Sequence, residues 1–174
     1  RKMGDWTMVD GDEGEPYTFG LNYVEQFRAP SAYVVNNPLA IGYDLEGDPA
    51  WGPHTGNQYM ISFAVNASST AKKHNDDWLI SPLLSGKAQT ATAWLKSYYS
   101  TYGPETYELL YSTKGTQLSD FVSLGTGEAP FDWTEVNILL PEGAKYFAIR
   151  HTSEDKYMFM VDDITYVPGG MTVK

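Results

Sequence analysis

Apolar and polar residues alternate with a period of two through most of the second half of the chain. The alternating segments are rich in β-branched and aromatic side chains, which is typical of half-buried β-strands. Their positions predict strands near residues 59–65, 78–81, 91–100, 106–112, 121–124, 132–140, 145–151 and 158–167. No helix fits between these segments, so the pattern predicts an all-β chain.

Turn-forming residues separate the predicted strands. Proline fixes φ and glycine reaches positive φ, and both interrupt a strand. The breakers are Ser81–Pro82, Tyr102–Gly103–Pro104, Lys114–Gly115, the segment from Gly125 to Pro130, and Pro141–Glu142–Gly143. Strands at short spacing without crossover helices are antiparallel, and so many strands exceed what one twisted sheet holds comfortably. We therefore predict a two-sheet antiparallel sandwich.

The first 58 residues show little alternation and many loop-forming residues. Long loops in a compact domain are functional or disordered, and abundant aromatic side chains argue that these loops are packed. The aromatic residues are Trp6, Tyr17, Phe19, Tyr23, Phe27, Tyr33, Tyr43 and Trp51. We expect one domain over residues 1–174, because this length is sufficient for a single core, with a loop-rich part over residues 1–58.

Composition and charge narrow the classes of partner. Hydrophobic residues make up 42% of the chain and aromatic residues 14%, which favours a folded protein over a disordered one. The formal net charge of -10 opposes binding to phosphate backbones and anionic lipids, so we do not expect nucleic acid as a partner. The chain has no cysteine, which excludes disulfides, thiolate metal sites and cysteine nucleophiles.

The sequence shows neither a membrane span nor an export signal. No apolar run reaches the roughly 18 residues of a transmembrane helix, and residues 1–5 lack the apolar core of a signal peptide. We therefore expect no transmembrane segment. Because the sequence starts at Arg1 rather than at a methionine, we expect a fragment or the mature part of a longer chain.

The acidic segment Asp10–Gly11–Asp12–Glu13 is a candidate calcium site. It places alternate carboxylates around a glycine, and calcium prefers about six to eight oxygen ligands. The segment is not an EF-hand, because Leu21 stands at the twelfth position, where that motif has a bidentate glutamate. An ordinary acidic turn is the alternative interpretation.

A second acidic segment, Asp162–Asp163, interrupts an apolar strand. By the period of two, one of the two carboxylates faces inward unless a bulge intervenes. A buried carboxylate needs a partner, since leaving it unpaired costs on the order of several kcal/mol. Calcium, Arg150 or backbone donors each satisfy that need.

Charged residues at two other strand ends have a structural and a functional interpretation. Arg150 beside His151 could contact a charged ligand, but we favour an ion pair with an aspartate inside the sandwich, for which Asp162 and Asp163 are candidates. Asp76 and Asp77 stand just before the strand that begins at Trp78. They could be metal ligands, charges at the strand edge or turn-forming residues, and we favour the turn.

The sequence contains none of the common catalytic motifs. Its three histidines, His54, His74 and His151, do not stand at metal-ligand spacing, and no Gly-x-Ser-x-Gly motif or phosphate loop is present. A glycosidase needs only two suitably placed carboxylates, so the 22 acidic residues leave that class open. We expect no enzymatic activity and no catalytic residue.

Aromatic side chains offer a surface on which a sugar could stack. For most of the aromatic residues in the predicted strands we expect core packing instead. Tyr102 at a turn and Trp51 beside Gly52–Pro53 are the better surface candidates, and we predict that these two residues bind ligand.

Seven blocks of sequence, in order, resemble the cleaved adhesin domain of gingipain-type haemagglutinins and its choice-of-anchor J relatives. The blocks run from Trp6 to Gly14, Asn75 to Pro82, Tyr107 to Lys114, Asp132 to Glu135, Leu140 to Gly143, Lys145 to His151 and Val161 to Ile164. They are spread over nearly the whole chain, from Trp6 to Ile164. Two features depart from the family pattern. The opening strand before Trp6 is absent, and the segment from Asp10 to Trp51 is longer than usual.

The resemblance implies a jelly-roll sandwich similar to galactose-binding and carbohydrate-binding modules, without an active site. It implies a non-catalytic adhesion module, secreted or on the outer surface of a bacterial cell, that binds host proteins or glycans as part of a larger polyprotein. The alternative is an accessory carbohydrate-binding domain of a secreted glycosidase or peptidase.

The resemblance also bears on the metal and the ligand. Related modules hold structural calcium near the terminal strand, which favours calcium at Asp162 and Asp163 as well as at Asp10, Asp12 and Glu13. The long loop segment places ligand specificity in the stretch before Tyr59, because loops that vary on a shared scaffold carry the binding.

Overall fold

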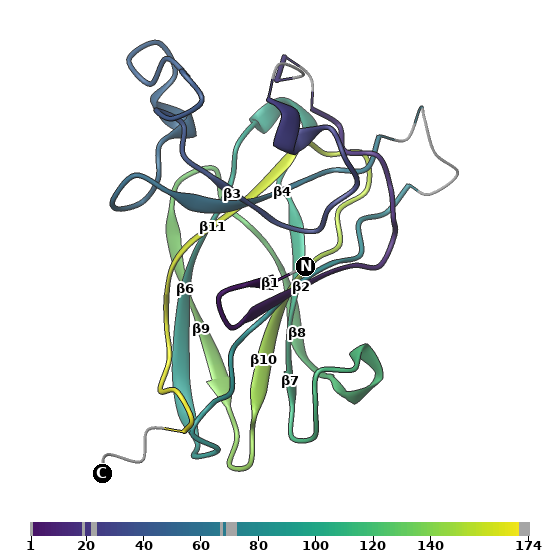
Figure 1. Cartoon of the computed structure of the whole chain (residues 1–174), viewed down its shortest axis with the longest axis vertical. Helices are drawn as coiled ribbons and strands as arrows, with labels where there is room; N and C mark the ends of the chain where they lie inside the picture. The colour runs from purple at the N-terminus through teal and green to yellow at the C-terminus, as the bar shows by residue number, and fades with distance from the viewer. Residues whose placement is uncertain (1, 19, 22–23, 67, 69–72, 171–174) are drawn as a thin grey trace.

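Two antiparallel β-sheets face each other in the computed structural model (Figure 1). The structure describes all residues except 1, 19, 22–23, 67, 69–72 and 171–174. One sheet has six strands in the order β1-β2-β5-β10-β7-β8, and the other has five in the order β3-β4-β11-β6-β9. This arrangement confirms the predicted all-β sandwich.

The strand bounds follow the sheet order. The six-stranded sheet consists of β1 (Lys2–Met3), β2 (Trp6–Asp10), β5 (Asp77–Ile80), β10 (Tyr146–His151), β7 (Thr106–Ser112) and β8 (Val122–Glu128). The five-stranded sheet consists of β3 (Val34–Asn36), β4 (Tyr59–Phe63), β11 (Met158–Thr165), β6 (Gln89–Ser97) and β9 (Thr134–Leu140).

All eight strands predicted from the alternation are present, and three short strands were not predicted. Those three, β1, β2 and β3, lie in the first 58 residues and are two to five residues long. The stretch that contains them shows little alternation of apolar and polar residues, so the pattern gives no signal for them. They form because neighbouring strands supply the pairing: β2 pairs with β1 and β5, and β3 pairs with β4.

The predicted break after residue 124 was wrong, because β8 continues to Glu128. Gly125 has φ 143°, and the register between β7 and β8 shifts between Leu109 and Leu110. Glycine at this position therefore forms a bulge inside the strand instead of ending it.

The main core lies between the two sheets. Ala91, Ala93 and Leu95 of β6 are fully buried at alternate positions, and Phe159 and Val161 of β11 are buried in the same cluster. Burying one large side chain of this kind contributes roughly 1.5–3 kcal/mol relative to exposing it. The alternation that the sequence displays is thus the alternation between this core and the other face of each sheet.

A second cluster covers the outer face of the five-stranded sheet. Ile61 of β4 and Met160 of β11 face away from the main core and pack in a cluster with Phe27 and Trp51. As a result, β4 is buried on both faces. The loop-rich N-terminal part supplies much of this cover.

The expected packing of the N-terminal aromatic side chains is confirmed for those among the described residues. Phe27, Tyr33 and Trp51 are each at most 1% exposed. Phe19 and Tyr23 lie outside the described residues.

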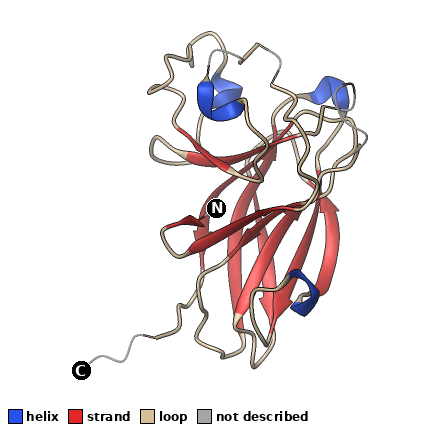
Figure 2. Cartoon of the chain, turned by 45° about the vertical axis from the view of Figure 1, so that its right-hand side comes forward, coloured by secondary structure: helices blue, strands red, loops and turns tan. Residues whose placement is uncertain are grey.

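The long loops and most of the short 3-10 turns gather at one end of the sandwich (Figure 2). The turns are η1 (Glu25–Phe27), η2 (Pro49–Trp51), η3 (Ser100–Tyr102) and η4 (Leu118–Asp120). Over the described part of the chain, no helix has the length and apolar character needed to cross a membrane.

Candidate binding site

A cavity of about 360 Å³ at the loop end is lined by six tyrosines and a tryptophan. We call it the tyrosine pocket. Its lining residues are Tyr17, Gly20, Leu21, Tyr43, Trp51, Tyr98, Tyr99, Tyr102 and Tyr157. Ligand pockets in proteins are commonly concave, largely apolar and rich in aromatic side chains, and this cavity has that character.

Four separate stretches of chain form the walls of the tyrosine pocket. Tyr17 comes from the N-terminal loop, and Tyr43 and Trp51 come from the connection between β3 and β4. The connection between β6 and β7 supplies residues 98–102, and Tyr157 directly precedes β11. The pocket therefore depends on the tertiary fold.

Backbone hydrogen bonds attach three of these stretches to the five-stranded sheet. Tyr17 N donates to Ala64 O at 2.7 Å, and Ala64 N donates to Tyr157 O at 2.8 Å. Tyr98 N donates to Met158 O at 3.2 Å. The rings of Tyr17, Tyr98 and Tyr157 are thus carried on backbone whose position the sheet determines.

The aromatic rings of the pocket meet at steep angles as well as in stacks. Trp51 stacks on Tyr43 with a centroid distance of 4.4 Å and an interplanar angle of 16°. Tyr98 meets Trp51 at 86°, and Tyr17 meets Tyr157 at 73°. The rings form walls in several directions instead of one flat platform.

Asp48 accepts hydrogen bonds from two of the phenols. Its Oδ2 accepts a hydrogen bond from the hydroxyl of Tyr43 at 2.9 Å and another from the hydroxyl of Tyr98. Burial and the hydrogen bond with Asp48 raise the pKa of Tyr98, and burial raises the pKa of Tyr157. Both phenols therefore remain neutral at physiological pH.

The accessible part of the pocket is formed by Tyr99 and Tyr102. Tyr99 is 46% exposed and Tyr102 is 40% exposed, directly before Gly103, whose φ of 80° ends the turn η3. Trp51 is 1% exposed, so its interpretation as a surface residue was wrong. The structure does bring Trp51 and Tyr102, the two predicted ligand-binding residues, to the same cavity.

Three carboxylates meet at a second place in the fold. Ligand atoms of Asp10, Asp12 and Asp77 all lie within 4.8 Å of one another, the only such acidic group among the described residues. The pairing of β2 with β5 produces this, because Asp10 stands directly opposite Asp77 in the register. Asp12 adds its carboxylate from the turn that follows β2.

Asp77 and Asp12 are the buried members of this carboxylate group, at 2% and 5% exposed. Asp77 lies deeper. Its Oδ2 accepts hydrogen bonds from Ser62 Oγ at 2.8 Å and from Asn75 Nδ2 at 2.7 Å. Burial raises the pKa of Asp77 well above its ordinary value, and the charges of Asp12 and Asp10 raise it further, against the effect of the two hydrogen bonds. The group concentrates negative charge that a hard cation would neutralise.

The other predicted metal ligands do not join this group. Glu13 is exposed, with a φ of 54°, and contributes its backbone N–H to Asp10 Oδ1 at 2.6 Å. Asp162 and Asp163 lie on β11 in the opposite sheet. The sequence-based set of five acids is therefore divided between two regions.

Donors from the β3–β4 connection satisfy Asp162 and Asp163. Asp162 Oδ2 accepts the backbone N–H of His54 at 2.9 Å, and Asp163 Oδ2 lies 2.6 Å from His54 Nδ1. Thr55 Oγ1 donates to Asp163 at 2.8 Å. A bulge between Asp162 and Thr165 lets both carboxylates turn toward these donors. Of the three partners predicted for this segment, the backbone donors are present.

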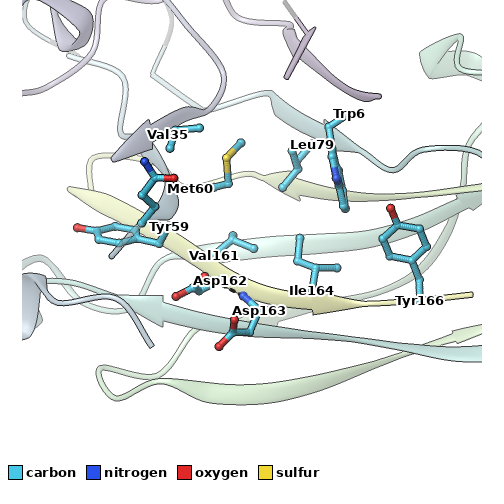
Figure 3. Close-up of a pocket in the computed structure, with 11 residues that line it drawn as sticks. Trp6, Val35, Tyr59, Met60, Leu79, Val161, Asp162, Asp163, Ile164 and Tyr166 are labelled. Atoms are coloured by element: carbon cyan, nitrogen blue, oxygen red, sulfur yellow. Dashed lines mark hydrogen bonds between the residues drawn. The ribbon is translucent and has the colours of Figure 1, made fainter. Parts of the chain in front are cut away.

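Asp162 and Asp163 also border a cleft of about 390 Å³ between the two sheets (Figure 3). Trp6 and Tyr166 stand at one end of the cleft and Tyr59 at the other. Most of the remaining wall consists of core side chains such as Met60 and Leu79. The cleft is thus an opening of the main core, and its carboxylates are already engaged by His54 and Thr55.

A serine, a histidine and a glutamate form a hydrogen-bonded series inside the sandwich. Ser62 Oγ lies 2.7 Å from His151 Nδ1, and His151 Nε2 lies 2.9 Å from Glu105 Oε2. Such a series is familiar from hydrolases, where the serine is accessible. Here all three residues are at most 2% exposed, so the arrangement is closed to a substrate.

Arg150 forms the predicted kind of ion pair, but with different partners. Its Nε donates to Asp76 Oδ1 at 2.6 Å and its Nη1 donates to Glu108 Oε2 at 3.0 Å. The guanidinium also lies over Trp78, 4.9 Å from the ring centroid. Asp76 is therefore an ion-pair acceptor and not the turn former that we favoured.

Two relations in these sites have no signal in the sequence pattern. Asp10 and Asp77 stand far apart in the chain, and only the pairing of β2 with β5 joins them, so the local pattern at Asp77 favours a turn. Tyr17 and Tyr43 carry no local signal that distinguishes them from other packed N-terminal aromatic residues. An excess of tyrosine in loops flanking the sandwich is the one feature that points to a pocket.

Known proteins support both the fold and the family. The family model described as Cleaved Adhesin Domain matches residues 47–166. Lys-gingipain of Porphyromonas gingivalis is 26% identical over 95% of this chain, and the chain spans 11% of that protein. The K1 cleaved adhesin domain of the same protein has a TM-score of 0.69 at 19% identity, over 97% of this chain and 94% of that one.

A carbohydrate-binding module shares the fold at lower similarity. TmCBM61, solved in complex with β-1,4-galactotriose, has a TM-score of 0.51 at 12% identity and covers 92% of this chain and 86% of that one. The family match extends over well more than half of the sequence and includes strands of both sheets. This chain belongs to the cleaved adhesin domain family.

Proposed function

We propose that this chain is a non-catalytic adhesion module, secreted or displayed on the outer surface of a bacterial cell, that binds host proteins or glycans. The tyrosine pocket carries the proposal, because it is a concave aromatic surface built from loops on a rigid sandwich. Tyrosine offers a large ring and a polar hydroxyl, a combination suited to binding surfaces. Membership of an adhesin family supports the same conclusion.

The module is further proposed to be one part of a larger polyprotein. The small share of Lys-gingipain that it spans supports this arrangement. The burial of Ser62, His151 and Glu105 keeps a substrate from these three residues, which supports the non-catalytic part of the proposal.

Binding to host-surface material tests the proposal directly. We expect the folded protein to bind extracellular-matrix proteins, haemoglobin or an immobilised glycan, and Tyr102→Ala to weaken that binding about tenfold, because it removes an exposed wall of the pocket. Surface plasmon resonance measures the affinities. Phe131→Ala is the matched control, since Phe131 is 39% exposed and does not line the pocket. Equal binding by wild type and Tyr102→Ala would contradict the role of the pocket.

An accessory carbohydrate-binding domain of a secreted glycosidase or peptidase is the second candidate. The fold shared with a galactotriose-binding module favours it. The parent open reading frame separates the two: a neighbouring catalytic domain supports the accessory role, whereas tandem copies of this module support adhesion.

Calcium is proposed as a structural cofactor at Asp10, Asp12 and Asp77. Three carboxylates supply hard oxygen ligands of the kind calcium prefers, and they lie within 4.8 Å of one another. Burial and the neighbouring acids raise the pKa of Asp77, and a bound cation would oppose that effect. When bound, the ion would neutralise this charge and hold the turn after β2 against β5.

Chelation tests the calcium proposal. A ligand at about 100 times its Kd stabilises the native state by about 2.7 kcal/mol, so we expect EDTA to lower Tm by about 5–10 °C in differential scanning calorimetry. Asp77→Asn should weaken this response, because it removes one carboxylate charge from the group without changing the size of the side chain. Glu13→Gln should keep the full response, since Glu13 is exposed and outside the group. An identical Tm with and without EDTA would refute the proposal.

A further inference from the structure

The shape of the tyrosine pocket favours a compact guest over a flat one. A sugar ring stacks best on one open aromatic face, whereas the rings here stand around the cavity at steep mutual angles. Tyr17 meets Tyr102 at 81° and Tyr99 meets Tyr157 at 80°. The tyrosine pocket therefore presents several rings to one small group at once, as do the aromatic cages that bind organic cations.

The carboxylates of Asp48 and Asp155 place negative charge near the tyrosine pocket. Asp48 accepts hydrogen bonds from the phenols of Tyr43 and Tyr98. A phenol that donates to a carboxylate has a more electron-rich ring, which strengthens the attraction of its face for a cation. The pKa of Tyr17 is raised by the hydrogen bond with Tyr102 and by burial, and the negative charge of Asp155 raises it further. With a net charge of -10, the chain as a whole attracts cations.

Two positive groups of the chain near the pocket are hydrogen-bonded to backbone carbonyls. Lys156 Nζ donates to the backbone carbonyl of Tyr102 at 2.8 Å. Lys96 Nζ donates to Ala50 O at 2.7 Å and lies over Trp133, 5.8 Å from its centroid. In the described residues, the two cations found over rings, Lys96 and Arg150, lie on aromatic side chains outside the pocket.

We propose that the tyrosine pocket takes a positively charged side chain, the guanidinium of an arginine or the ammonium of a lysine, exposed on a partner protein. The inference rests on the proposed function, because it names the ligand class of the same pocket. A cavity of about 360 Å³ accommodates such a head group with part of its aliphatic stem.

Small probes test this ligand class by isothermal titration. The probes are N-acetylarginine amide, N-acetyllysine amide, the neutral arginine isostere N-acetylcitrulline amide, and β-1,4-galactotriose. We expect both cationic probes to bind about tenfold more tightly than the citrulline probe, because a desolvated cation over aromatic rings gains up to a factor of about thirty. Comparing the affinities of the arginine and lysine probes shows which head group the pocket prefers.

Two substitutions at Tyr99 separate the ring from its hydroxyl. Tyr99→Phe keeps the ring face, so the preference for arginine over citrulline should persist. Tyr99→Leu removes the ring, and the preference should fall about threefold or more. Tyr99 is 46% exposed, so both variants should fold, which circular dichroism verifies.

Lys156→Gln tests the charge argument independently. It removes a positive group at the rim, and we expect arginine binding to tighten about twofold to fivefold while galactotriose binding is unchanged. Phe131→Ala should leave all the titrations as in wild type, since Phe131 lies outside the pocket.

Failure of this inference is distinguishable from failure of the proposed function. Equal affinity for the arginine and citrulline probes, or no binding of either cation, overturns the cationic ligand. If Tyr102→Ala still weakens binding to a host protein or to galactotriose, the adhesion module stands with a neutral ligand. If Tyr102→Ala changes no binding at all, both proposals fall.

Discussion

Replacing Glu105 with alanine is expected to destabilise the protein by about 3–5 kcal/mol, the usual result of removing one partner from a buried charged network. Glu105 is 2% exposed. Its Oε1 accepts the backbone N–H groups of Tyr157 at 2.7 Å and Met158 at 2.6 Å, and its Oε2 lies 2.9 Å from His151 Nε2. Alanine leaves these buried donors without an acceptor.

The pH dependence of stability identifies the charge on Glu105 as the cause. Burial alone would raise its pKa, but the hydrogen bond and charge of His151, together with Ser153 and the Tyr157 N–H, lower the pKa below the ordinary 4.5. A carboxyl whose pKa is lowered in the folded state stabilises the protein above its unfolded pKa. That stabilisation is lost as the pH falls through the lower, folded value.

Urea unfolding of wild type and Glu105→Gln from pH 7 to pH 3 measures this contribution. We expect the difference in unfolding free energy to be constant at neutral pH and to shrink below about pH 4.5, as wild-type Glu105 takes up its proton. Glu108→Gln is the control, because Glu108 pairs with Arg150 outside this network. A difference that stays constant down to pH 3 would show that the charge of Glu105 does not stabilise the fold.

Replacing Trp51 with alanine is the second large effect that we expect, at about 3–5 kcal/mol for a fully buried tryptophan. Trp51 packs in the outer cluster with Ile61 and Met160 and stacks on Tyr43. The substitution therefore opens a cavity between the β3–β4 connection and the sheet, and it removes the buried side of the tyrosine pocket.

Chemical denaturation gives the loss of stability, and amide hydrogen exchange locates it. We expect faster exchange in residues 37–58, the connection that Trp51 anchors. Tyr99→Ala serves as the comparison, because it removes a ring of the same pocket that is 46% exposed and should cost less than about 1 kcal/mol. A loss below about 1 kcal/mol for Trp51→Ala as well would mean that the connection does not depend on its tryptophan.

The sandwich was predictable because its longer strands carry their own signal. In β11, Phe159 and Val161 face the main core, and Met158 and Met160 face the outer cluster. A strand buried on both faces is a continuous apolar run that stands out in any sequence. β3, with three residues, has no such run and exists because β4 lies beside it.

The acidic group was half predictable. The spacing of Asp10 and Asp12 suggests a cation site within one turn. Asp77 completes the group only through the register of β2 on β5, and a pattern that covers neighbours in sequence contains no register between distant strands. The strand pattern and the family resemblance together pointed to Asp162 and Asp163, whose carboxylates His54 and Thr55 engage.

The pocket was the least predictable feature. Tyr102 was recognised because a glycine follows it at a turn. Trp51 was selected for the right cavity but for the wrong reason, since it is buried beneath Tyr43 and not exposed beside Gly52. Whether an aromatic residue in a loop packs inward or lines a cavity depends on loops elsewhere in the chain, which local pattern does not describe.

The division of the pocket walls among four stretches of chain has a consequence for how such a domain diversifies. Each stretch is joined to the five-stranded sheet, by a backbone hydrogen bond or by the strands that it connects, so the sheet carries the backbone of every wall. Descendants of one ancestral module can therefore vary the side chains of the walls on a common framework. A lineage carrying several copies would acquire a repertoire of recognition surfaces while every copy retained the same inherited framework.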